Sequence, residues 1–313
     1  MDKKHVAVLG AGKMSLGIAQ LFATKGYPVK IVDINNDRSR YDPYEIIRGN
    51  LQVLAENEAL EESEIPAILD QISIVETLEE IRDFADIVFE AIIEVLDIKQ
   101  EWFRKMDEIL PEHVILASNT SALSITAIAE KSVHRERIIG THYWNPAYLI
   151  PLVEVVKTEY IAEDTVTRTC ELLKGAGKHP VVVQKDAPGF IANRMQHALF
   201  REALYIIEQG IAKPEDVDDA IKYGFGMRLG IAAPIEVMDM GGMDLTYNIH
   251  KYLFPYLNNS TEPSKLLTDA IAAGNLGFKT GKGIEEWPPE AVKKANTELE
   301  TGLIRVLKAL DRL

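Results

Sequence analysis

The sequence predicts an α/β protein, with a mainly parallel sheet in its first part and an all-helical second part. Short β-branched runs alternate with longer helical patterns through roughly the first 185 residues, which is typical of a parallel sheet covered by helices on both faces. The run 86–92 is almost entirely apolar, as expected for a strand buried on both sides. After the segment Asp186-Ala-Pro-Gly189 the strand signals end and helical periodicity takes over.

The expected strands are short and evenly distributed along the first part: Val6–Gly10, Val29–Asp33, Ile72–Val75, Asp86–Ile92, Val114–Asn119, Arg137–Trp144, Leu152–Val156 and Pro180–Gln184. Helical patterns lie between them at Met14–Gly26, Ile98–Leu110 and Thr165–Ala176. A final amphipathic helix is expected over Glu290–Leu313. We place the domain boundary near residue 186, so that residues 1–186 form the sheet domain and residues 187–313 the helical domain.

The composition is that of a globular protein without a nucleic-acid or membrane role. The 313 residues carry a net charge of −14, and such an acidic surface repels phosphate backbones. No apolar run approaches the roughly 18–20 residues that a membrane-spanning helix needs. Cys170 is the only cysteine, so no intrachain disulfide can form. We therefore expect a cytoplasmic protein that binds neither nucleic acid nor a membrane.

A glycine-rich turn follows the first strand and begins a helix. Its sequence is Gly10-Ala-Gly12-Lys-Met14-Ser15, and in a dinucleotide site the first glycine makes the turn while the second lets the backbone approach the pyrophosphate. The sequence therefore predicts a Rossmann-type cofactor domain in which Gly10, Gly12 and Met14 contact the cofactor. Ser15 stands where the fingerprint has glycine or alanine, and its hydroxyl is available to a phosphate.

Asp33 indicates which dinucleotide is bound. It ends the second strand, 21 residues after Gly12, where a carboxylate accepts the ribose hydroxyls and repels a 2′-phosphate. NAD is therefore the expected cofactor. Arg38 and Arg40 follow closely and leave NADP as an alternative. No metal site is predicted.

A histidine and a glutamate follow in the last strands. His142 comes near the end of a strand, and Glu154 stands among valines in the next one. A buried carboxylate is costly unless it is paired, so His142, 12 residues earlier, is its expected partner. A carboxylate on one imidazole nitrogen leaves the other free to take the proton of a substrate hydroxyl, while the hydride goes to the nicotinamide. Taken alone, His142 is equally well explained as a structural histidine.

Two further polar residues are candidates for substrate contacts. Ser121 ends the sequence Ser-Asn-Thr-Ser after the fifth strand, at the edge where ligands bind in open α/β sheets. Asn193 follows Pro188-Gly-Phe190 at the start of the helical part. The structural alternative for both residues is a helix cap.

Together these motifs resemble the L-3-hydroxyacyl-CoA dehydrogenase superfamily over essentially the whole chain. The resemblance rests on Ser-Asn-Thr-Ser, on His-x-x-Asn-Pro with a glutamate 12 residues after the histidine, and on Asp-x-Pro-Gly-Phe-x-x-Asn-Arg. It implies His142 as the catalytic base, Glu154 as its orienting partner, and Ser121 and Asn193 as contacts to the substrate oxygen. It also implies a homodimer formed through the helical domain, and NAD contacts from Glu94, Lys99, Ser121, Asn145 and Lys279.

Two departures from the CoA-using branch bear on the substrate. That branch carries basic residues on the helical hairpin after the second strand, whereas residues 34–64 contain eight acids, three arginines and no lysine. The segment Gly226–Pro234 is longer than the expected turn and resembles the branch of L-gulonate and L-carnitine dehydrogenases, which act on free acids. Arg228 in this segment is suited to a substrate carboxylate; its alternative is a solvated surface arginine. Three aromatic residues of the segment His142–Ile150 either pack the sheet or form a cage for a cationic substrate: Tyr143, Trp144 and Tyr148.

The leading hypothesis is therefore an NAD-dependent dehydrogenase that oxidises a free 3-hydroxycarboxylate to a 3-oxo acid. The first alternative is an L-3-hydroxyacyl-CoA dehydrogenase, such as a 3-hydroxybutyryl-CoA dehydrogenase. The second, of a different class, is a non-catalytic NAD-binding protein similar to the crystallin relatives.

Overall fold

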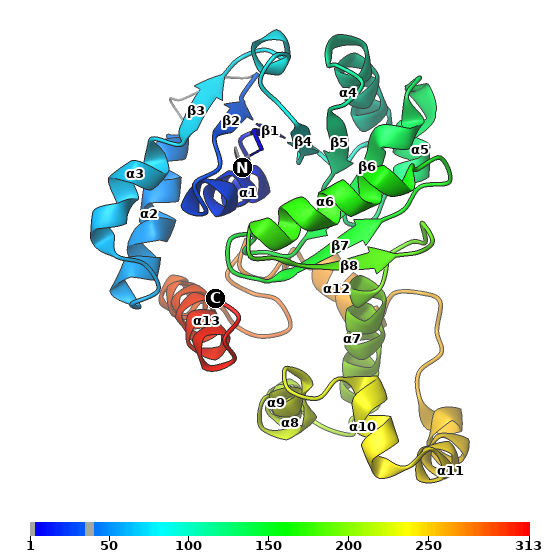
Figure 1. The fold of residues 1–313 in the computed structure, drawn as a ribbon. Coiled ribbons are helices and arrows are strands. Elements are labelled where there is room, and N and C mark those ends of the chain that lie inside the picture. Colours follow the sequence, from blue (N-terminus) through cyan, green and yellow to red (C-terminus); the bar gives the residue numbers. More distant parts are fainter. Residues whose placement is uncertain (1–3, 35–40) are drawn as a thin grey trace. The chain divides into compact units, whose positions relative to one another are not determined.

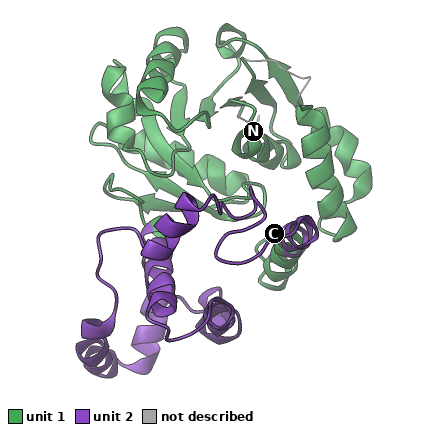
Figure 2. Ribbon diagram, turned by 180° about the vertical axis from the view of Figure 1, so that it is seen from behind, with its two compact units in different colours: residues 1–193, 299–313 green, residues 194–298 purple. Residues whose placement is uncertain are grey.

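The computed structural model describes residues 4–34 and 41–313 (Figure 1). Arg38 and Arg40, on which the NADP alternative depends, lie outside the described residues. The chain forms two compact units (Figure 2): unit 1 comprises Met1–Asn193 with Leu299–Leu313, and unit 2 comprises Arg194–Glu298. The expected boundary at residue 186 thus lies seven residues before the end of the first segment of unit 1, and the last 15 residues pack with the sheet unit rather than with the helical one.

Unit 1 contains one eight-stranded sheet of order β3-β2-β1-β4-β5-β6-β7-β8. All neighbouring strands are parallel except β6 and β7, which are antiparallel. The strands agree with the expected ones to within two residues at each end: β1 Val6–Leu9, β2 Val29–Val32, β3 Ile72–Val75, β4 Ile87–Glu90, β5 Ile115–Ser118, β6 Ile138–Tyr143, β7 Leu152–Val156 and β8 His179–Val183.

Helices cover both faces of this sheet, as Figure 1 shows. Helices α1 (Lys13–Thr24) and α6 (Glu163–Gly175) pack in one hydrophobic core, and α4 (Leu96–Ile109) and α5 (Ile125–Ile128) in the other. Because side chains alternate along a strand, Val6 and Val8 enter the first core while Ala7 and Leu9 enter the second. This double burial explains the apolar runs of the sequence.

A helical hairpin after β2 is joined by the last helix of the chain. The hairpin consists of α2 (Pro43–Glu56) and α3 (Ile65–Leu69), and α13 spans Pro289–Ala309. Ile304 and Leu307 of α13 are buried in the same core as α2. Nζ of Lys308 donates to the carbonyl oxygens of Asn57 and Glu58, both at 3.1 Å, and a cation at a helix C-terminus is favourable. These contacts explain why residues 299–313 belong to unit 1.

Unit 2 is helical, as expected. It contains most of α7 (Ala192–Glu208), the beginning of α13, and the elements between them: α8 Pro214–Ala220, a π-helical turn Ile221–Phe225, α9 Gly226–Leu229, α10 Pro234–Gly241, α11 Met243–Leu253 and α12 Lys265–Ala272. Of its described apolar residues only Val217 is buried. Across the described parts of both units, no helix is both long and apolar enough to cross a bilayer.

Candidate active site

The site lies at the edge where the parallel strands end. Leu9, Glu90 and Ser118 are register partners across β1, β4 and β5, so the segments after these three strands begin at the same edge. Asp33 directly follows β2 and is buried. His142 is the last but one residue of β6. The parallel order of the sheet thus brings together the candidate residues of five separate sequence segments.

The glycine-rich turn has the geometry of a dinucleotide site. Gly10 has a φ of +105°, and a Cβ there would lie 3.2 Å from the carbonyl oxygen of Ala91. Gly12 is the N-cap of α1, and a Cβ there would meet nothing within 4 Å, so the backbone at this helix N-terminus is open to a pyrophosphate. The suggestion that Ser15 faces a phosphate is wrong, because its buried hydroxyl donates to the Ala91 carbonyl at 3.3 Å. Met14 lies partly exposed in the first turn of α1.

A buried ion pair joins α4 to the end of β4. Nζ of Lys99, on α4, is 2.5 Å from Oε1 of Glu90, and both side chains are at most 1% exposed. The other oxygen of Glu90 accepts the hydroxyl of Ser118 at 2.7 Å. Lys99 also lies 3.3 Å from Oε2 of the half-exposed Glu94. Lys99 therefore joins a structural carboxylate at the end of β4 to a second carboxylate that reaches solvent.

Glu94 in turn fixes the segment after β5. Its Oε1 accepts the hydroxyl of Thr120 and the backbone N–H of Ser121, the latter at 3.1 Å. Burial raises the pKa of Glu94, but the Thr120 hydrogen bond and the nearby Lys99 ammonium outweigh it and hold the pKa below its usual value. Glu94 is thus ionised at neutral pH. It holds Ser121 at the edge of the sheet.

His142 and Glu154 form the expected pair. Nδ1 of His142 lies 2.8 Å from Oε2 of Glu154, and both side chains are buried. The other oxygen, Oε1, accepts the backbone N–H groups of Ile191 and Ala192 at 2.9 and 3.0 Å. Burial raises the pKa of Glu154, yet the His142 hydrogen bond and these two N–H groups together lower it below its usual value.

The state of this pair follows from the ionised carboxylate. An ionised carboxylate only accepts hydrogen bonds, so Nδ1 of His142 carries a hydrogen and Nε2 is the basic nitrogen. The ring is flanked by Trp144 and Phe190, with centroids 5.5 and 5.7 Å away. Nε1 of Trp144 also lies 3.4 Å from Oε2 of Glu154. This arrangement is suited to the role of an oriented general base, which the sequence predicts for His142.

Asn193 lies beside Ser121 in unit 1. Its Nδ2 donates to the carbonyl oxygen of Ser121 at 3.3 Å. Asn145, three residues after His142, is exposed. Arg228 on α9 and Lys279 are exposed residues of unit 2, and their contribution to the site remains a prediction.

Sequence reasoning missed two residues near this site. Glu90 is an acid at the end of an otherwise apolar strand, which is the same signal that led to Glu154. Asp186 accepts the Ser124 hydroxyl at 2.6 Å and the Thr126 N–H at 2.8 Å, and so ties the beginning of α5 to the segment before α7. No spacing rule connects positions 62 residues apart, so this contact could not be foreseen.

Comparisons with known proteins point to one family. Residues 5–187 match the family model of the 3-hydroxyacyl-CoA dehydrogenase NAD binding domain, and residues 189–287 match that of its C-terminal domain. A probable 3-hydroxybutyryl-CoA dehydrogenase of Bacillus subtilis is 38% identical over 92% of this chain and 98% of its own length. The 5-formyl-3-hydroxy-2-methylpyridine 4-carboxylate 5-dehydrogenase of Mesorhizobium japonicum is 30% identical over 98% of both chains.

Two solved structures are similar to this chain over most of its length. A 5-formyl-3-hydroxy-2-methylpyridine 4-carboxylic acid 5-dehydrogenase, described as an NAD+ dependent dismutase, is similar with a TM-score of 0.90 and 28% identity over 99% of both chains. An (S)-3-hydroxybutyryl-CoA dehydrogenase of Ralstonia eutropha is similar with a TM-score of 0.74 and 32% identity, over 92% of this chain and 100% of its own.

Proposed function

Because the chain belongs to the 3-hydroxyacyl-CoA dehydrogenase family and is an NAD-dependent dehydrogenase acting on CH–OH groups, we propose that it oxidises the alcohol of a small free hydroxycarboxylate, with a 3-hydroxy acid giving a 3-oxo acid. His142 is the catalytic base, since its Nε2 is the nitrogen left free by the 2.8 Å contact to Glu154. That contact is the observation on which the proposed chemistry depends.

Each candidate residue of unit 1 has its own role in the proposed reaction. When bound, NAD supplies the acceptor for the hydride of the carbinol carbon. Nε2 of His142 takes the hydroxyl proton, and the Glu154 carboxylate stabilises the imidazolium that results. The two N–H groups of the α7 N-terminus keep Glu154 ionised in its buried position. Ser121 and Asn193 contact the substrate oxygen.

The residues that would hold NAD come from several segments. The open backbone at Gly12 receives the pyrophosphate and Asp33 the ribose. Gly10 and Met14 of the glycine-rich turn are further proposed contacts. The remaining ones follow the resemblance: Glu94, Lys99, Ser121, Asn145 and Lys279. Lys99 is almost fully buried by Glu90 and Glu94, so we propose that it acts on the cofactor by placing Glu94.

The substrate class rests on the charge of the helical hairpin after β2, where residues 34–64 contain eight acids, three arginines and no lysine. In the CoA-using branch that the chain resembles, basic residues on this hairpin meet the CoA phosphates. Lys308 of α13, the cation beside the end of α2, is already bound to the carbonyl groups of Asn57 and Glu58. The C-terminal family model ends at residue 287, before this helix. The relative that matches 98% of the chain is named for a pyridine carboxylate, and this also supports a free acid.

Arg228 is the proposed partner of the substrate carboxylate. It is exposed and carries no ion pair among the described residues, so its guanidinium is available for a bidentate contact. Arg228→Lys should raise KM for the free acid more than it lowers kcat, because the charge remains while the two-pronged geometry is lost.

A substrate panel tests the proposal. Formation of NADH or NADPH is followed with 3-hydroxybutyrate, carnitine, gulonate, the alcohol form of the pyridine carboxylate and 3-hydroxybutyryl-CoA, each with NAD and with NADP. The proposal predicts a higher kcat/KM for at least one free acid than for the CoA thioester. A higher kcat/KM for the thioester would instead favour the CoA enzyme that the Bacillus relative suggests. NADH binding without any turnover would favour the non-catalytic alternative.

We further propose that the chain acts as a homodimer through unit 2. Large apolar side chains of unit 2 are widely exposed, including Met240 at 81% and Tyr252 at 74%. Such a surface is typical of an interface. Light scattering after size exclusion should give twice the chain mass, and Met240→Glu with Tyr252→Glu should lower it; a monomeric wild type would refute the proposal.

A further inference from the structure

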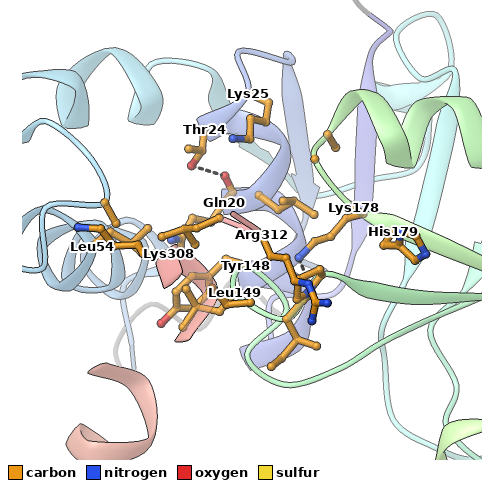
Figure 3. A pocket seen from close by; sticks show the side chains of 18 of the residues that line it. Gln20, Thr24, Lys25, Leu54, Tyr148, Leu149, Lys178, His179, Lys308 and Arg312 are labelled. Atoms are coloured by element: carbon orange, nitrogen blue, oxygen red, sulfur yellow. Dashed lines mark hydrogen bonds between the residues drawn. The ribbon is translucent and has the colours of Figure 1, made fainter. Parts of the chain in front are cut away.

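A cavity lies within unit 1, and none of the residues assigned to the active site lines it. It has a volume of about 1000 Å³ and is shown in Figure 3. Its walls come from the ends of α1, α2 and α13, from the loop before β7 and from the turn before β8. The apolar part of the lining includes Leu21, Leu54, Leu149, Ile150 and Leu307. The cavity is therefore large enough for a small metabolite, and part of its wall is apolar.

Basic side chains predominate in the polar part of the lining, although the protein as a whole is acidic. The titratable side chains that line the cavity come from every wall: Lys25 at the end of α1, Glu58 after α2, Tyr148 in the loop before β7, Lys178 and His179 at the start of β8, and Lys308, Asp311 and Arg312 at the end of the chain. Glu58 and Lys308 lie 3.9 Å apart and balance one another. Asp311 is the remaining acidic side chain of the lining, which also contains the basic side chains of Lys178 and Arg312.

Lys178 is the unusual member of this group. It is 6% exposed, and its Nζ donates to the carbonyl oxygens of Ala147 and Ile150, both at 2.7 Å. Both acceptors are neutral, and none of the described residues gives it a carboxylate partner. Burial, followed by the charge of Lys25, lowers the pKa of Lys178 to about 7. A buried ammonium without a counter-ion is destabilising.

We propose that this cavity is a binding site for an oxyanion, with Lys178 and Arg312 contacting the anionic group and the leucine side chains facing an apolar remainder of the ligand. An anion supplies the counter-charge that the protein does not provide for Lys178. The ligand class is a small phosphorylated or carboxylated metabolite, and inorganic phosphate is its simplest probe.

Occupation of this site acts on the active-site loop. Lys178 holds the carbonyl groups of residues 147 and 150, and this loop begins directly after Asn145. An anion that keeps Lys178 charged strengthens both hydrogen bonds, because ionised donors form the stronger bonds. The site is thus an effector site that orders the loop following His142. This effect on turnover rests on the proposed function, whereas binding itself does not.

Phosphate binding is measured with NADH at saturation, so that the pyrophosphate site is already filled. The melting temperature is recorded against phosphate concentration, with potassium chloride at matched ionic strength as the reference. Wild type should be stabilised more by phosphate than by chloride, because a ligand that binds the native state raises its stability. Lys178→Met and Arg312→Gln should each lose most of this difference. Lys213→Gln, at a side chain 77% exposed in unit 2, should retain it.

A second measurement does not depend on activity or on the stability of a variant. Anion binding raises the proton affinity of Lys178, so at pH 8 phosphate binding should be accompanied by proton uptake, seen by calorimetry in buffers of different ionisation enthalpy. Arg312→Gln, at an exposed position, keeps the test valid if Lys178→Met does not fold. Equal stabilisation by phosphate and chloride, or an unchanged phosphate response in Arg312→Gln, would overturn the proposal.

Discussion

His142 and Glu154 are direct partners in the antiparallel ladder between β6 and β7. The 2.8 Å contact of their side chains is therefore set by backbone register and not by a flexible loop. Facing residues of an antiparallel pair bring their Cβ atoms within about 4.5–5.5 Å of one another, which suits an imidazole and a carboxylate. The base of the proposed reaction is thus held in place before any ligand binds.

Replacing the base separates chemistry from cofactor binding. His142→Gln should lower kcat by about 10²–10⁴-fold, the usual contribution of a general base. The dissociation constant of NADH, measured by fluorescence titration, should stay nearly constant because the glycine-rich turn is untouched. A variant that retains kcat within a few-fold of wild type would show that another group takes the proton.

Glu154 should contribute to stability in a defined pH range. Its pKa in the folded protein is below the ordinary value of 4.5, so its contribution is fully present above that value and is lost as the pH falls through the folded-state pKa. Glu154→Gln should therefore remove part of the fall in stability on the acid side, measured as the urea midpoint at each pH. Glu163→Gln, at a side chain 77% exposed, should leave the fall of the urea midpoint at acid pH as it is in the wild type.

The buried pair of Glu90 and Lys99 should be sensitive to the loss of one partner. Lys99→Met leaves the Glu90 carboxylate buried without its cation, and breaking such a pair costs about 3–5 kcal/mol. Urea unfolding measures the loss. Lys105→Met, at an exposed position of the same helix, is the matched control. The double variant with Glu90→Gln should recover part of the stability; no recovery would mean that packing, and not charge, is responsible.

Lys178 should make stability rise with pH in a higher range than Glu154 does. Its pKa is about 7 in the folded protein against an ordinary value of 10.5, so between these values the unfolded chain binds more protons than the folded one. The free energy of unfolding should then rise with pH across this range. Lys178→Met should flatten the rise, measured in chloride buffers without phosphate. An identical slope in wild type and variant would contradict the lowered pKa.

Much of the fold could be predicted from local patterns. Buried parallel strands give apolar runs, and the eight runs of this sequence became the eight strands. The proposed catalytic pair was also predictable, because a glutamate among valines needs a partner and His142 was near in sequence. The same reasoning would have identified Glu90, had it been applied to the end of β4.

Other features depend on contacts between distant segments. The amphipathic pattern of α13 predicts a helix but not the surface it covers, so its packing on α2 could not be foreseen. Lys178 reads as a surface lysine before a strand, and its burial depends on the walls that residues 147–150 and α13 supply. The Ser15 hydroxyl turned to Ala91 because the strand end and helix start approach closely, which a motif alone does not specify.

Because β6 and β7 are antiparallel, the ladder that holds the proposed catalytic pair and the segment that connects the two strands are different parts of the chain. Residues 144–151 connect the two strands, yet the ladder and not this connection holds the imidazole against its carboxylate. A substitution in the connection can therefore change what surrounds the ring while the register of the two strands still pairs the imidazole with its carboxylate. The position of the proposed base thus depends on strand pairing, whereas its surroundings depend on a segment of eight residues.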